Sequence, residues 1–122
     1  MDLRTKLQIK PGQRVRAVGA PPEVDLAALL DAPGATDAAD AARADVVIAF
    51  VRSGAELSTT AAPALAAAKD DRTAWIAYPK GGGLGTDLNR DVLRAALAAH
   101  GIRPVRQIAI DEVWSALRFR PG

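Results

Sequence analysis

The apolar residues of this chain form runs with the period of a strand, separated by runs with the period of a helix. The clearest strand is the β-branched run at 44–51, ADVVIAFV, which is typical of a strand buried on both faces of a parallel sheet. Further strands are predicted at 14–18 and 73–78. The runs at 105–110 and 113–119 are joined by so short a link that they must form an antiparallel hairpin.

Apolar residues three and four apart predict helices near 3–7, 22–31 and 87–100. Pro22 suits the first position of its helix, and Gly101 suits the end of the last one. The strands and helices therefore alternate along most of the chain.

The segment between the two clearest strands also has helical character. Ser53 and Glu56 match a capping box, which predicts a helix running to about Lys69. Pro63 lies inside it, so either the helix bends there or a first turn ends and a second helix starts. Residues 35–44 are small and polar, and they fit either a short edge strand or an irregular crossover.

The alternation of strand and helix predicts one α/β domain over residues 1–122. We expect a small three-layer Rossmann-like domain, with a mostly parallel sheet between helices and a C-terminal antiparallel hairpin at its edge. This prediction requires the runs that hold Ile48 and Ile76 to be parallel neighbours.

Two resemblances bear on the fold. The stretch from Lys10 through Gly19, together with the closing hairpin, resembles a trimmed class I methyltransferase fold. That resemblance implies S-adenosylmethionine at the first glycine-rich turn, with Asp37 or Asp40 as the ribose-binding acid. Here the turn reads GAPP at 19–22, so two prolines stand where that superfamily has flexible glycines.

The second resemblance covers almost the whole chain. The segments IKPGQRV, ADVVIAFVRS, WIAYPKGG, TDLNRDVL and RPVRQIAIDEVWSALRFR resemble a family of small bacterial proteins described only as a domain of unknown function. This resemblance implies a fold and carries no activity with it.

The composition excludes several kinds of functional site. The chain has no cysteine, which excludes disulfides, thiolate catalysis and cysteine-ligated zinc, and fits the cytoplasm. No long apolar run predicts a membrane span or a signal peptide. Basic residues outnumber acidic ones after residue 71, which suits a small anionic ligand.

The predicted binding site is the glycine-rich stretch after the strand at 73–78. Its backbone N–H groups could hold an anion beside Lys80, with Thr86 or Asp87 capping the next helix and Arg52 at the equivalent end of the neighbouring strand. The predicted ligand-binding residues are Lys80, Gly81, Gly82, Gly83, Arg52, Thr86 and Asn89. The alternative is a surface loop whose glycines only reverse the chain.

A second group of cations lies on the predicted hairpin, at Arg103, Arg106, Arg118 and Arg120. With Trp114 on the same face, they could bind a nucleotide or a nucleic-acid strand. The more ordinary interpretation is that they keep an edge strand solvated. An exposed hairpin edge carrying Trp114 also predicts a possible homodimer.

No catalytic or metal-binding residues are predicted. His100 is the single histidine, and Asp111 and Glu112 fit a solvated hairpin turn. We therefore expect a non-catalytic module that binds a small anionic ligand or a protein partner, with no cofactor identified. The alternatives are a divergent methyltransferase-like or nucleotide-dependent transferase, and a weak nucleic-acid binder, which is the least favoured because acidic residues are interleaved.

Overall fold

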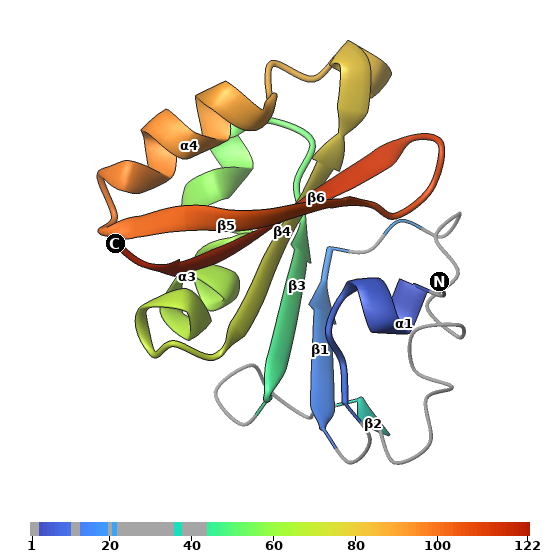
Figure 1. The fold of residues 1–122 in the computed structure, drawn as a ribbon. Coiled ribbons are helices and arrows are strands. Elements are labelled where there is room, and N and C mark those ends of the chain that lie inside the picture. Colours follow the sequence, from blue (N-terminus) through green and yellow to red (C-terminus); the bar gives the residue numbers. More distant parts are fainter. Residues whose placement is uncertain (1–2, 11–12, 20, 22–35, 38–43) are drawn as a thin grey trace.

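The strands join in one six-stranded mixed sheet (Figure 1). The computed structural model describes residues 3–10, 13–19, 21, 36–37 and 44–122. The strands are β1 (Arg14–Val18), β2 (Thr36–Asp37), β3 (Val46–Phe50), β4 (Thr73–Pro79), β5 (Ile102–Ala109) and β6 (Trp114–Pro121). Across the sheet their order is β2-β1-β3-β4-β6-β5, in which β2, β1, β3 and β4 are parallel while β6 and β5 are antiparallel to their neighbours.

The described helices are short. They are α1 (Leu3–Lys6), α3 (Ala62–Lys69) and α4 (Arg90–Ala98), with 3-10 helices η2 (Gly54–Ser58) and η3 (Lys80–Gly85). Pro63 lies in the first turn of α3, which confirms the alternative in which a second helix starts there. Thr36 and Asp37 form an edge strand, one of the two predictions for that region. The helix predicted at 22–31 lies outside the described residues.

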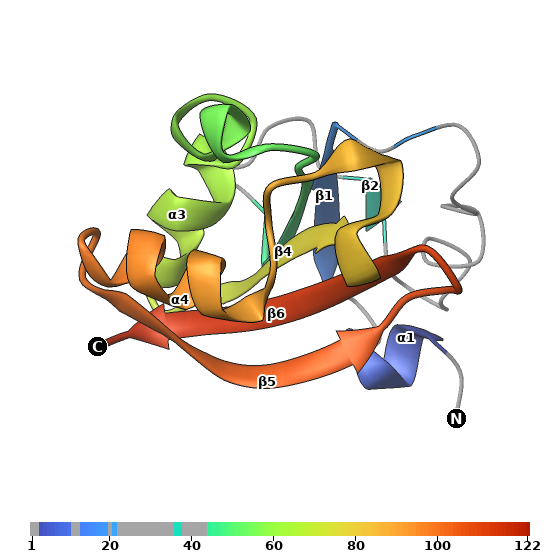
Figure 2. The ribbon, with the colours of Figure 1, turned by 90° about the horizontal axis from the view of Figure 1, so that it is seen from above.

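The prediction of a three-layer Rossmann-like domain with a mostly parallel sheet is wrong. The antiparallel pairs β4–β6 and β5–β6 join more residues than the parallel pairs do. In the described part of the chain, α3 and α4 both pack on one face of the sheet, whereas the other face carries only the short α1 (Figure 2). Strand–helix alternation does not reveal this, because the face that a helix takes depends on the strand order.

The parallel pairing of β3 with β4 is confirmed, since Ala49 lies opposite Ile76 in the register. Every residue of β3 is buried, and successive side chains alternate between two apolar clusters. Val47 and Ala49 face α3 and α4, whereas Val46 and Ile48 face the α1 side. Burial on both faces accounts for the continuous β-branched run in the sequence.

The N-terminal segment covers the α1 side of the sheet. Leu7 and Ile9 are buried there with Trp75 of β4, which has 0% exposure. The indole Nε1–H of Trp75 donates a buried hydrogen bond of 3.0 Å to the carbonyl oxygen of Leu7. This bond satisfies a polar group that burial would otherwise penalise, and it fixes the start of the chain against the central sheet.

The C-terminal hairpin is confirmed as an antiparallel addition at the edge of the sheet, but the order of its two strands buries a residue that was predicted to be exposed. Strand β6 lies between β4 and β5, so Trp114, Ser115, Ala116 and Leu117 are all buried. The prediction of an exposed Trp114 is therefore wrong, because only β5 forms the edge. Trp114 is the side chain on which the prediction of a homodimer rested, and it is not at the surface.

Gly19, the residue after β1, lies very close to the end of β3. It has φ +70°, and a Cβ there would lie 2.9 Å from the Phe50 carbonyl oxygen and 2.7 Å from Thr60 Cγ2. At Gly101, which has φ +77°, a Cβ would meet nothing within 4 Å.

We expect Gly101→Ala to lower the free energy of unfolding by about 1 to 2 kcal/mol, from backbone conformation alone. Gly19→Ala should lower it further, since the new methyl group also collides with β3. Urea denaturation measures both. Equal losses in the two variants would contradict the close approach of the chain after β1 to β3.

Candidate functional site

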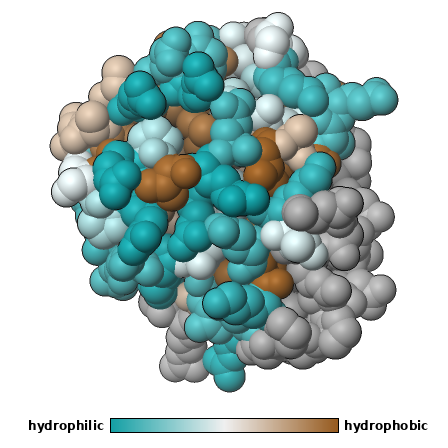
Figure 3. Space-filling view, viewed as in Figure 1, coloured by the Kyte–Doolittle hydropathy of each residue, from teal (hydrophilic) through white to brown (hydrophobic). Residues whose placement is uncertain are grey.

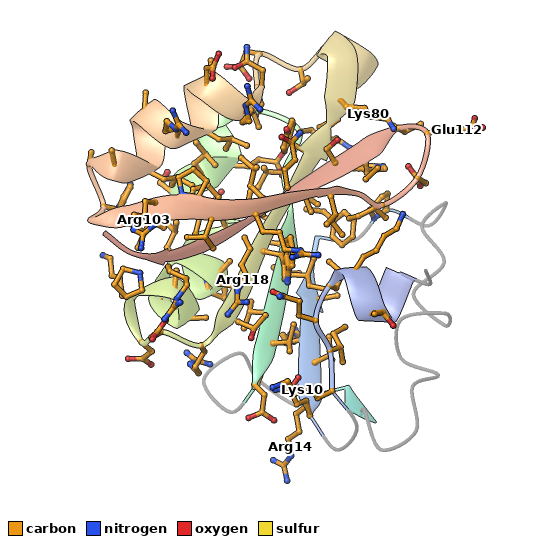
Figure 4. All side chains as sticks on the ribbon, in the orientation of Figure 1. Lys10, Arg14, Lys80, Arg103, Glu112 and Arg118 are labelled. Carbon is orange, nitrogen blue, oxygen red and sulfur yellow. The ribbon has the colours of Figure 1, made fainter. Side chains whose placement is uncertain are left out.

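Strands β3 and β4 end at the same edge of the sheet, and each is followed by a cation. We call this edge the sheet rim, defined by Arg52 after β3, Lys80 after β4 and Trp114 at the start of β6. The guanidinium carbon of Arg52 lies 5.7 Å from the centroid of the Trp114 ring, a cation–π contact. Trp114 pairs with Pro79, the residue before Lys80, which is labelled in Figure 4, and Phe50 of β3 pairs with Ala77 of β4. The strand register therefore places both cations at the same end of the sheet.

The acidic residues near the rim are bonded to backbone N–H groups. Glu56 Oε1 accepts from the Arg52 N–H at 2.8 Å, and Asp87 Oδ1 accepts from the Gly54 N–H at 3.0 Å. The second bond joins the chain after β3 to the segment that precedes α4. In the hairpin turn, Asp111 Oδ1 accepts from the N–H groups of Val113 and Trp114, both at 2.8 Å. These acids hold the loops in place rather than neutralising the cations.

The capping box predicted at the rim is wrong in detail. Ser53 is the N-cap of η2, but its side chain makes no capping bond. Glu56 reaches back one residue further than a capping box requires, to Arg52 instead of Ser53. The acidic residue therefore fixes the backbone of the arginine that was predicted to contact a ligand.

The glycine-rich stretch forms η3 and does not run directly into a longer helix. Its glycines provide backbone freedom: Gly81 and Gly85 have φ +63° and +69°, and a Cβ at either would meet nothing within 4 Å. Gly82 and Gly83 also lie within η3, and a Cβ at Gly83 would touch only Pro79, at 3.8 Å. Bonds of the 3-10 type use N–H groups inside the segment, so fewer of them are free to converge on an anion than the sequence predicted.

Thr86 and Asn89 have local structural roles. Thr86 Oγ1 accepts from the Leu88 N–H at 3.0 Å, and Asn89 Oδ1 accepts from the Val92 N–H at 2.8 Å. Asn89 is the N-cap of α4, so the prediction of Thr86 or Asp87 as the cap is wrong. The structure thus brings Lys80 and Arg52 to one edge, while Thr86 and Asn89 stabilise the path to α4.

The hairpin arginines share one face. We call Arg103, Arg106, Arg118 and Arg120 the arginine cluster. Arg103 lies opposite Arg120 in the register, and Arg106 lies opposite Arg118. A register shift between Pro104 and Arg106 keeps both β5 arginines on the same side of the hairpin. This is the α1 side, where Trp114 and Ala116 of β6 are buried.

Two residues distant in the sequence contact the cluster. Asp71 receives two hydrogen bonds from Arg120, at 2.9 and 3.0 Å, and this bonding holds the pKa of the Asp71 carboxyl below its usual value. Gln8 Oε1 accepts from Arg118 Nη1. Burial, and then the charges of Arg120 and Arg106, lower the pKa of Arg118, whose Nε is buried without a hydrogen-bond partner.

Sequence reasoning missed these contacts because they join residues far apart along the chain. Arg118 and Gln8 are separated by 110 positions, and Arg120 and Asp71 by 49. Local patterns show no sign of either contact. The stacking of Arg52 on Trp114 depends in the same way on the insertion of β6 beside β4.

The chain matches no protein-family model and no curated protein by sequence. The two family resemblances therefore stay predictions. Among the described residues, no group of three or more histidine, cysteine or acidic side chains is placed to hold a metal ion. No helix of the described segments is both long and apolar enough to cross a membrane.

The capping role of Asn89 gives a direct test. We expect Asn89→Ala to lower the free energy of unfolding by about 1 kcal/mol, because the first turn of α4 loses its side-chain acceptor. Asn89→Asp should retain most of the stability. Chemical denaturation measures both variants, and an unchanged stability in Asn89→Ala would contradict this assignment.

The contact between Asp71 and Arg120 predicts a pH dependence. The pKa of Asp71 is lower in the folded state, so its ionised form contributes stability above its ordinary pKa, and that contribution is lost as pH falls through the folded-state pKa. Asparagine tolerates the left-handed backbone at this position, where φ is +58°. The melting temperature of Asp71→Asn should lie below that of the parent protein at neutral pH, and the difference should shrink in acid. A difference that does not vary with pH would refute the contribution of this ion pair.

Proposed function

We propose that this domain is a non-catalytic module that binds a small anionic ligand at the sheet rim through Arg52 and Lys80. The supporting observation is that these two cations end adjacent parallel strands and have no carboxylate partner in the described part of the chain. The carboxyl ends of parallel strands are where ligands commonly bind in α/β proteins. A guanidinium and an ammonium together suit a phosphate or carboxylate group.

The surroundings of the two cations support this proposal. Arg52 stacks on Trp114, which limits its orientation, and the Lys80 backbone N–H is anchored to the Val113 carbonyl oxygen at 2.8 Å. Glu112 is an exposed acid on the same hairpin turn, and it opposes anion binding (Figure 4).

The test is a melting-temperature titration with inorganic phosphate, inorganic pyrophosphate and nucleoside monophosphates, followed by calorimetry on any ligand that binds. A ligand that prefers the native state raises the melting temperature as its concentration increases. Arg52→Ala and Lys80→Ala should each weaken binding about tenfold, because a bond to a charged group contributes roughly 1.5 kcal/mol or more. Glu112→Gln should strengthen it.

Matched controls are the exposed residues Arg94 of α4 and Lys69 of α3. Arg94→Ala and Lys69→Ala should leave the affinity unchanged. Equal losses in the controls and the rim variants would contradict a site at the rim. Turnover of a methyl donor or a nucleotide that Lys80→Ala abolishes would contradict a non-catalytic role.

A further inference from the structure

The arginine cluster holds like charges directly opposite each other on two antiparallel strands. Cross-strand pairs of the same sign destabilise a sheet, and this hairpin has two of them, Arg103 with Arg120 and Arg106 with Arg118. In the described residues only Asp71, which bonds Arg120, is in an ion pair with the cluster. Solvation of an edge strand would require neither this pairing nor four arginines on one face.

The two residues that bond Arg118 and Arg120 share an uncommon backbone conformation. The described non-glycine residues with positive φ are Gln8, at 61°, and Asp71, at 58°. These are the same two residues that hold Arg118 and Arg120. Such a conformation is unfavourable for a side chain like that of Gln8, and it persists only where the surroundings impose it. Gln8 follows α1 and Asp71 follows α3, so the ends of two helices place the residues that bond Arg118 and Arg120.

The cluster lies on an open face that consists mainly of polar side chains. Hydrophilic residues cover much of the coloured surface in Figure 3, with separate hydrophobic patches among them, and Figure 4 labels Arg103 and Arg118 on the hairpin side of the molecule. Most of the side chains of β5 are exposed. Such an exposed, charged face suits the backbone of a polymer better than a small molecule, which binds in a concave pocket.

Aromatic side chains are excluded from this surface. All five aromatic residues of the chain are buried, with at most 3% of their surface exposed. No ring is therefore available for bases to stack on, so base stacking cannot contribute to binding at this face. Binding at this face would therefore depend on electrostatic attraction to phosphates. Such contacts do not depend on the base sequence.

We propose that the arginine cluster binds the phosphate backbone of a nucleic acid, without reading its bases. Arg103 and Arg106 supply the exposed phosphate contacts on β5, while bonds to Gln8 and Asp71 fix the positions of Arg118 and Arg120 on the neighbouring strand. Guanidinium groups bind phosphate oxygens in bidentate geometry, and the two cross-strand pairs of arginines follow each other along the hairpin at a spacing of about 7 Å. This site is separate from the rim, so it does not rest on the anionic ligand proposed there.

An acidic protein segment is the competing partner, and the structure disfavours it. An extended peptide would bind by adding a strand to the free edge of β5. Pro104 and the register shift beside it interrupt that edge, since proline has no N–H group to donate.

The test is fluorescence anisotropy of the full chain with a short labelled single-stranded DNA, measured over a series of salt concentrations. We expect affinity to fall steeply with salt and to be independent of base sequence. For Arg103→Ala/Arg106→Ala, the slope of log affinity against log salt should decrease in magnitude by about 1.4, since two phosphate contacts are lost at about 0.7 each. Arg94→Ala, which removes an exposed arginine from α4 on the opposite side of the sheet, should leave the slope unchanged.

Stability gives an independent readout. Without DNA, Arg106→Ala should melt at a higher temperature than the parent protein, because it removes the repulsion with Arg118. A lower melting temperature would overturn the proposal, as would absent DNA binding at low salt, or an equal effect of Arg94→Ala. Displacement of the DNA by oligoglutamate at equal charge concentration would also overturn it and would assign the face to acidic protein segments. Arg52 and Lys80 are intact in all of these variants, so failure here leaves the rim site standing.

Discussion

Strand β4 is the constraint on which the rest of the structure depends. It pairs in parallel with β3 on one side and antiparallel with β6 on the other, so it joins the two halves of the sheet. Trp75 in this strand also binds the carbonyl group of Leu7 from within the core. That buried bond places Gln8 beside Arg118, and the end of the same strand delivers Lys80 to the rim. One strand therefore fixes both candidate sites.

The acidic and the basic residues near the two candidate sites have different roles. The acids at the rim are bonded to backbone N–H groups, where they stabilise loops, and among the described residues the basic side chains beside them have no carboxylate partner. Along β6, Trp114, Ala116 and Arg118 share the α1 side of the sheet, so the cation–π contact of Arg52 and the arginine cluster lie along one face. Anion binding at either place would relieve unpaired positive charge, which is the physical reason to expect it.

Local patterns in the sequence predicted the elements well where one physical preference dominated. The β-branched run of β3 requires burial on both faces, and the short link after β5 permits only a hairpin. Arrangement in space was harder to predict. Strand–helix alternation favoured helices on both faces, but α3 and α4 share one, and the insertion of β6 beside β4 buried Trp114. Of the predicted site, Arg52 and Lys80 lie at the same end of the sheet because parallel strands end together. The roles of Asn89, Gln8 and Asp71 depend on backbone geometry and distant contacts, which no local pattern contains.

The central claim is that cations on the α1 side of this sheet form anion-binding surfaces. Nuclear magnetic resonance of the arginine Nε–H groups during titration with a short DNA strand tests it most directly. We expect shifts at Arg103, Arg106 and Arg118 that saturate together, with no shift at Arg94. Shifts spread evenly over all arginines, or confined to α4, would contradict it.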